Sequence, residues 1–139
     1  MKYIDELYSQ IETKDKDTIQ NLCNIFVNWT IHYAKIVYSS EPMPFEKYLD
    51  NITAENLKEI SNVAYLSATY APDNLAYNVA MYVSDAADYA TKKILPGVGK
   101  CMDEAAKLAK RWVGNKIDYK KESEMIEISL LESALGIKQ

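Results

Sequence analysis

The sequence predicts an all-α protein, folded as a single compact bundle of five or six helices over residues 1–139. Apolar residues recur at spacings of three and four along most of the chain, which is the period of a helix face. No stretch alternates between apolar and polar residues over the length of a strand. Only four glycines and four prolines interrupt a chain with 48% hydrophobic residues. A chain of this length buries roughly two-thirds of its unfolded surface, so its core needs no metal or disulfide.

The strongest helical pattern runs from Asp17 to Tyr38. Its apolar side chains fill an arc of about 200° and are Ile19, Leu22, Cys23, Ile25, Phe26, Trp29, Tyr33, Ala34, Ile36 and Val37. A helix with so wide an arc contacts several neighbours, so we expect it at the centre of the bundle, with Trp29 in the core. Ile31 falls outside the arc and is expected at the surface. His32, the only histidine, is expected there too, because no partner that would make it a catalytic base is identifiable.

Shorter helices flank this segment. The first is amphipathic and carries Tyr3, Ile4, Leu7, Tyr8 and Ile11. Pro42 and Pro44 break the chain before a short helix at residues 45–49. Thr53 is placed to cap the next helix, whose apolar face consists of Leu57, Ile60, Val63, Ala64 and Ala68. Leu66 lies off that face and is expected at the surface.

Pro72 or Asp73 is expected to start a further helix, and residues Leu75 to Leu95 show its helical pattern. One side of it consists of Leu75, Ala76, Val79, Ala80, Val83, Ala86, Ala87 and Ala90. Small side chains let another helix approach closely, so this side is expected inside the bundle. The opposite, solvent-facing side carries Asn78, Asp85, Asp88 and Lys92.

The segment "LPGVGK" at residues 95–100 is interpreted as a turn that breaks the chain. An apolar stripe then runs from Cys101 to Trp112 and stops at Gly114, a suitable residue for a helix C-cap. Asp118 can begin a last helix that reaches Leu135, just before Gly136.

The last helix carries two apolar stripes on nearly opposite sides. One consists of Ile128, Leu131 and Leu135, and the other of Ile126, Leu130 and Ala134. A helix on the outside of a monomer needs only one stripe. Either this helix is sandwiched within the bundle, or its second stripe is an interface. We favour the interface, in a homodimer or with a partner protein. The candidate interaction residues are Ile126, Leu130 and Ala134, together with the basic residues Lys107, Lys110 and Arg111.

Charge and composition narrow the functional classes. The net charge is -4 and Arg111 is the single arginine, which argues against specific nucleic-acid binding. From Pro96 to Lys121, seven basic and three acidic residues give a local charge of +4, which we interpret as a solvated surface.

Cys23 and Cys101 lack metal-site spacing and are expected as free buried thiols. The polar start of the chain and the lack of a long apolar run predict a cytoplasmic protein that does not enter membranes.

Two carboxylate pairs have spacings that could hold magnesium: Asp85-x-x-Asp88 and Glu124-x-x-Glu127. Their spacing is similar to the motifs of all-α nucleotide pyrophosphohydrolases of the MazG type. The paired glutamates that open the first motif of that family are missing, and the order of its motifs is not reproduced. Pairs of this spacing are also common on solvated helix faces. We therefore predict no catalytic, cofactor-binding or metal-binding residues, and keep a metal-dependent nucleotide hydrolase as an alternative.

The segment "CMDEAAKLAKRWVGNKIDYKKESE" resembles a pattern in small alanine-rich helical immunity proteins of bacteria and their phages. The residues that match are Ala105, Ala109, Trp112, Gly114 and Asp118, and "SDAADYA" is similar to the alanine–tyrosine–aspartate runs of that group. The resemblance implies a binding role against a toxin or defence component, with no catalytic residues and no cofactor. The leading hypothesis is thus a non-catalytic module that inhibits or neutralises a partner protein. A small-ligand or nucleotide-binding protein that uses the tyrosines is a further alternative.

Overall fold

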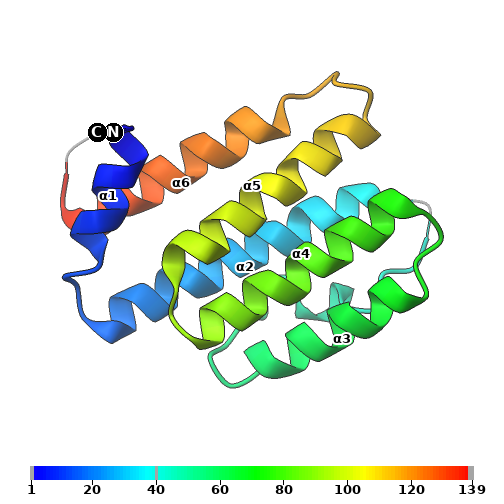
Figure 1. Ribbon diagram of the computed structural model, residues 1–139, viewed down its shortest axis with the longest axis horizontal. Coiled ribbons are helices and arrows are strands. Elements are labelled where there is room, and N and C mark those ends of the chain that lie inside the picture. The colour runs from blue at the N-terminus through cyan, green and yellow to red at the C-terminus, as the bar shows by residue number, and fades with distance from the viewer. Residues whose placement is uncertain (1, 40, 138–139) are drawn as a thin grey trace.

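The computed structural model describes residues 2–39 and 41–137 (Figure 1). All regular structure in these ranges is helical, as predicted. The elements are α1 (Tyr3–Ile11), α2 (Lys16–Val37), the 3₁₀ helix η1 (Glu46–Tyr48), α3 (Leu57–Thr69), α4 (Asn74–Thr91), α5 (Leu95–Trp112) and α6 (Tyr119–Leu135). The predicted domain also contains residues 1, 40, 138 and 139, which lie outside the described residues.

Helices α2, α4 and α5 pack against one another and form the centre of the fold (Figure 1). Helix α3 covers α4 on one side, and α6 lies along α5 on the other. The short α1 packs against α6 near the end of that helix. The predicted central position of α2 is therefore correct, although α2 shares it with α4 and α5. None of the helices in the described ranges combines the length and apolar content that crossing a bilayer requires.

Side-chain caps set the starts of three helices. Asp15, Asp73 and Asp118 accept backbone N–H bonds at the first turns of α2, α4 and α6, at 2.8, 2.8 and 3.1 Å. Gly114 and Gly136 follow the ends of α5 and α6 with φ of 67° and 74°, the left-handed conformation that ends a helix. The predicted boundaries at Asp73, Asp118, Gly114 and Gly136 are confirmed.

The interpretation of "LPGVGK" as a turn is wrong, because α5 begins at Leu95 and includes both glycines. Pro96 lies in the first turn of α5, where the missing N–H leaves no intrahelical bond unmade. The break comes earlier, at residues 92–94, where Lys93 adopts a φ of 57°. The predicted cap at Thr53 is also wrong. Its hydroxyl accepts from the Asn56 N–H in a turn that precedes α3.

The buried side of α2 is rotated from the predicted one. Ile31, expected at the surface, is 0% exposed, whereas Ile25 is 39% exposed and Trp29 is only half-buried. The segment around η1 explains the difference, because it lies against the side of α2 that carries Ile31. Asn28, three residues before Ile31, exchanges two hydrogen bonds with Asp50. Periodicity within α2 could not reveal this cover, which comes from a distant loop.

The small-residue side of α4 is buried, as predicted. Its fully buried members include Val79, Ala80, Val83, Ala86, Ala87 and Ala90. Helices α2, α3 and α5 all contact α4, so this one helix is enclosed on three sides. Asp85 and Asp88 remain at the surface, and Leu66 on α3 is 58% exposed, also as predicted.

We predict that Ala87→Leu destabilises the fold by about 1–3 kcal/mol, because the added carbons have no room between the packed helices. Asn78→Leu is the matched control, since it adds a leucine at an exposed position of the same helix. That change should alter stability by no more than about 0.5 kcal/mol. Urea unfolding followed by circular dichroism measures both values. An equally stable Ala87→Leu variant would contradict the close packing of α4.

Candidate protein-binding groove

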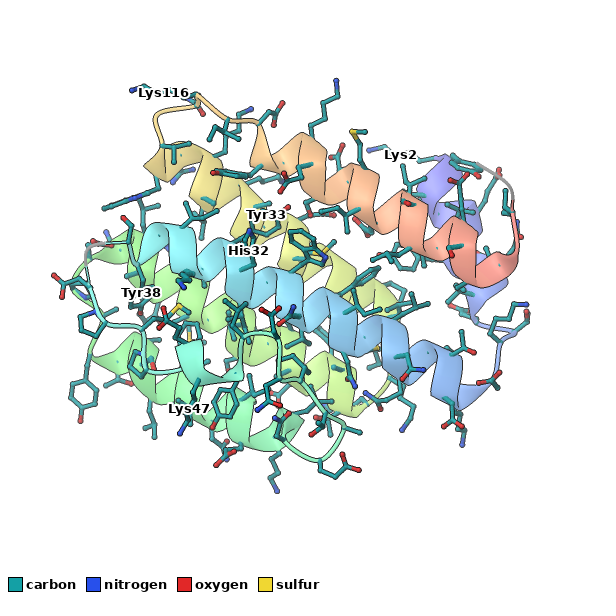
Figure 2. The ribbon with its side chains drawn as sticks, turned by 180° about the vertical axis from the view of Figure 1, so that it is seen from behind. Lys2, His32, Tyr33, Tyr38, Lys47 and Lys116 are labelled. Carbon is teal, nitrogen blue, oxygen red and sulfur yellow. The ribbon has the colours of Figure 1, made fainter. Side chains whose placement is uncertain are left out.

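An apolar groove of about 660 Å³ lies between α2 and α6. Its walls are Ile25 and Trp29 from α2, and Met125, Ile126 and Leu130 from α6. The two helices run side by side on the face seen in Figure 2. The groove forms because α6 packs mainly on α5, which lies beneath it, and makes only limited contact with α2.

The groove leaves large apolar side chains accessible. Met125 is 61% exposed and Ile25 is 39% exposed. Ile126 and Leu130, from the predicted second stripe of α6, are half-buried and line the groove. Ala134, the third member of that stripe, is half-buried outside it. Leu131, from the first stripe, is 0% exposed and belongs to the core. Ile128 and Leu135, the other members of the first stripe, are half-buried like the second stripe, so what distinguishes the second stripe is that Ile126 and Leu130 border the groove.

The α2 wall of the groove carries no charge. From Thr18 to Ala34, α2 contains no aspartate, glutamate, lysine or arginine. On α6, Glu127 is buried and Glu132 accepts a 2.5 Å hydrogen bond from Tyr3, so neither faces the groove. The charged lining residues are confined to the start of α6 and are Asp118, Lys121 and Glu122. Depletion of charge around a half-buried tryptophan is typical of the centre of a protein interface.

Aromatic side chains connect α2 to the start of α6, where the charged residues of the groove lie. The Trp29 ring lies 5.1 Å from His32 and 6.0 Å from Tyr33, between ring centroids. Tyr33 contacts Tyr119 at 5.8 Å and donates a 2.8 Å hydrogen bond to Glu122. Burial raises the pKa of Tyr33, with the Glu122 bond as the next cause, so the phenol stays a donor. These contacts join α2 to α6 and hold Trp29 in place.

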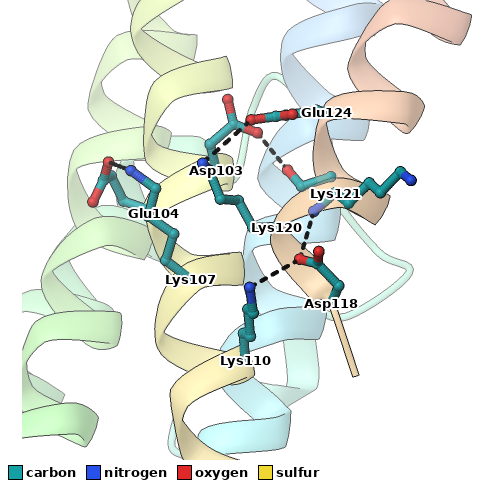
Figure 3. A network of polar contacts seen from close by, with 9 residues as sticks. Asp103, Glu104, Lys107, Lys110, Asp118, Lys120, Lys121 and Glu124 are labelled. Carbon is teal, nitrogen blue, oxygen red and sulfur yellow. Dashed lines mark hydrogen bonds and ion pairs between the residues drawn. The ribbon is translucent and has the colours of Figure 1, made fainter. Parts of the chain in front are cut away.

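The three basic candidate residues lie on α5, beside the groove rather than in its walls. Lys110 forms an ion pair with Asp118 at 3.4 Å and so contacts the charged end (Figure 3). Lys107 pairs with Glu104 on its own helix at 2.9 Å. Arg111 is exposed. Of the six candidate interaction residues, Ile126 and Leu130 therefore line the groove, and Lys110 reaches it through Asp118.

The two carboxylate pairs are not brought together. Asp88 on α4 accepts a 3.0 Å hydrogen bond from Ser61 of α3, whereas Glu124 on α6 pairs with Lys120 at 3.9 Å. Within residues 2–39 and 41–137, no group of three or more histidine, cysteine, aspartate or glutamate side chains is arranged to hold a metal ion. Of the exposed tyrosines, Tyr65, Tyr70 and Tyr77 lie on or between α3 and α4, whereas Tyr3 and Tyr89 line hollows that Lys100 of the basic stretch also lines.

Glu127 was expected on a solvated face and is instead 2% exposed. It accepts a short hydrogen bond from the Tyr8 hydroxyl and is hydrogen-bonded to Asp103 of α5. Asp103 also accepts a 2.6 Å bond from Ser123 (Figure 3). The cause of this burial is α1, which packs on α6 and covers the carboxyl. Nothing in the sequence indicated this burial, because an i, i+3 carboxylate pair normally indicates a solvated face.

Burial, followed by the hydrogen bond and the negative charge of the neighbouring Asp103, raises the pKa of Glu127 to about 9. Burial also raises the pKa of Asp103. The pair therefore holds one proton at neutral pH. Within the described chain, Glu127 Oε1 has no donor to accept from. A proton on Glu127 makes this missing donor unnecessary, because the neutral carboxyl itself donates a hydrogen bond to Asp103.

No family model, curated protein or solved structure matches this chain. The resemblance to immunity proteins therefore stays a prediction. The residues that carry it have structural roles. Ala105 and Ala109 are buried, and Asp118 caps α6. Trp112 donates a 3.2 Å hydrogen bond to Ser39, and Gly114 adopts its left-handed conformation after α5.

We predict that Gly99→Ala destabilises the protein, although alanine is the better helix former. A Cβ at position 99 would lie 2.6 Å from Glu127 Oε2 and would overlap the Tyr8 hydroxyl, and both side chains are buried. The expected loss is about 1–3 kcal/mol. Gly97→Ala is the comparison, because its Cβ also lies under 3 Å from a side chain, the Tyr89 ring, but that ring is 39% exposed and so has solvent on one side, and the loss should be smaller. Equal effects of the two changes would contradict this account.

We also predict opposite outcomes for neighbouring leucines of α6. Leu131→Glu places an unpaired charge in the core and should unfold the protein. Leu130→Glu can turn its carboxylate into the open groove, so the variant should fold. Far-ultraviolet circular dichroism and a thermal melt distinguish the two. Unfolding of both variants would show that the groove is closed in solution.

Proposed function

We propose that this protein is a non-catalytic module that binds an apolar helix of a partner protein in the α2/α6 groove and thereby neutralises the partner. The observation that carries the proposal is the accessible, uncharged wall of the groove, in which Trp29 is held by neighbouring rings. A rigid aromatic anchor in such a setting is typical of residues that dominate binding energy. The resemblance to immunity proteins supports the same role.

The dimensions of the groove fit a helix. Its lining on α6 extends from Asp118 to Leu130, which corresponds to about 18 Å along the helix axis. A partner helix of about 12 residues has that length. Two parallel or antiparallel helices form a channel into which the side chains of a third helix can pack. Recognition of this kind uses apolar anchors at i, i+3 or i+4, and i+7 of the bound helix.

The charges define the partner further. An uncharged wall favours a helix whose inward face is apolar and also uncharged, because a buried unpaired charge is costly. At the start of α6, Asp118 already pairs with Lys110, whereas Glu122 accepts a hydrogen bond from Tyr33 and has no ion pair within the described residues. A partner helix with a basic residue at that end would gain an ion pair. Such binding would cover an apolar helix that the partner needs for its own activity, which would neutralise it.

The test uses Trp29 as the reporter. The chain has two tryptophans, so Trp112→Phe leaves Trp29 as the single emitter. Synthetic helices of about 12 residues with leucines at the anchor spacing and one terminal lysine serve as probes. We expect saturable binding with a blue shift of Trp29 emission, weakened at least about tenfold by Leu130→Glu. Leu66→Glu is the matched control, because Leu66 is an exposed leucine outside this groove, and it should leave binding unchanged.

The outcomes are distinct. No emission shift with any probe would contradict the proposal. Light scattering that shows a dimer, converted to a monomer by Leu130→Glu, would instead mean that a second copy occupies the groove. For neutralisation itself, a photo-crosslinker at Met125 identifies the natural partner, whose activity should fall on adding the wild-type protein. Addition of the Leu130→Glu variant should leave that activity unchanged.

A further inference from the structure

Helix α1 is a short element that depends on docking for its order. It has nine residues, and a helix this short has little stability alone in water. Its main packing partner is α6. The buried side chains of α1 are Leu7, Tyr8 and Ile11. At its start, Tyr3 donates a 2.5 Å hydrogen bond to Glu132. The apolar contacts and this bond are few, so one further interaction can determine whether α1 stays docked.

That interaction is a chain of polar side chains that joins three helices. Tyr8 of α1 donates to Glu127 of α6, and Glu127 is hydrogen-bonded to Asp103 of α5. Ser123 of α6 completes the chain through its 2.6 Å bond to Asp103. Gly99 of α5 makes the arrangement possible, because any larger residue would occupy the space of the Tyr8 hydroxyl.

Basic side chains lie near Glu127, but none of those in the described residues forms an ion pair with it. A polar hollow of about 350 Å³ adjoins the cluster. Its charged lining residues come from the start of the chain, from α5 and from α6, and are Lys2, Asp5, Lys100, Asp103, Glu104, Lys107, Lys120 and Glu124. From α2, the Cys23 thiol faces Tyr8, and burial raises the pKa of that thiol to about 12, so it is neutral. Lys107 and Lys120 pair with Glu104 and Glu124, and within the described residues no lysine forms an ion pair with Glu127.

We propose that α1 is a strap that closes over α5 and α6 only while Glu127 is uncharged, and that raising the pH releases it. With the strap closed, an ionised Glu127 would lie beside Asp103 with no cation to pair with it. With the strap open, water would solvate the carboxylate. The proposal concerns the side of α6 that faces α1, and it stands whether or not a partner binds the groove on the other side.

The direction of the pH dependence follows from proton linkage. The pKa of Glu127 is about 9 with the strap closed, and exposure to water would return it to its ordinary value of 4.5. Between these values the closed state holds one proton more than the open state, so rising pH favours opening. The opening equilibrium constant should rise up to about tenfold for each pH unit in this window. Closure is complete below the ordinary pKa and is lost as the pH passes about 9. Burial raises the pKa of Tyr8, so its phenol remains a donor throughout.

Amide hydrogen exchange of the full chain tests the strap. Protection factors are used because intrinsic exchange also accelerates with pH. The reporters are the Glu6 and Glu12 amides, which donate to the carbonyls of Lys2 and Tyr8. Between pH 6 and 9 their protection should fall up to about tenfold per pH unit, while amides inside α4 should lose far less. In Glu127→Gln the fall should disappear, because the amide cannot ionise. In Glu55→Gln, an exposed carboxylate before α3 that does not line the hollow, the wild-type fall should remain.

Constant protection of α1 in the wild-type protein over this range would overturn the proposal. The same fall in Glu127→Gln as in the wild type would overturn it as well. Should that variant fail to fold, ¹³C detection of the Glu127 carboxyl in the wild-type protein decides the matter. The strap proposal is supported if this carboxyl titrates well above its ordinary pKa and over the same pH range in which α1 loses protection. Titration near the ordinary value contradicts it.

Discussion

The close packing of α4 against three other helices is the contact on which the rest of the structure depends. Alanine and valine side chains on α4 allow α2, α3 and α5 to approach its axis closely. These helices then provide the surfaces on which the later elements lie: α6 on α5, and α1 on α6. Apolar burial decreases along this series, from a helix enclosed on three sides to one held partly by polar side chains. The outermost helices are therefore the ones with accessible surface and with polar contacts that can change.

Helix α6 has the most mixed environment of the six. One side borders the open groove through Ile126 and Leu130, and another places Leu131 in the core. Between them, the buried Glu127 is covered by α1. A helix with these contacts has no single apolar face, so its position depends on neighbours rather than on its own amphipathic pattern. This explains why both the proposed binding surface and the proposed strap involve α6.

The sequence predicted those features that depend on local chemistry. Aspartates before helices and glycines after them act within a few residues, so the boundaries at Asp73 and Gly136 could be found directly. The small side of α4 was also visible, because it recurs on one helix. The wrong predictions involve distant contacts. Ile31 is buried by a loop that follows α2, and Glu127 is buried by a helix more than a hundred residues earlier in the chain. The groove shows the same difference between local and distant features. The second stripe of α6 lies on one helix and was predicted, whereas the opposite wall on α2 comes from a distant part of the chain and was not.

The crowding at Gly99 also constrains how this sequence can diverge. The backbone of α5 and the side chains of Tyr8 and Glu127 occupy one shared volume, with no space for a single additional carbon. A substitution that enlarges position 99 is tolerable only after position 8 or position 127 has become smaller. The three positions are therefore expected to change together in related chains, and the order of the changes is fixed: the loss of bulk on α1 or α6 must precede any gain on α5.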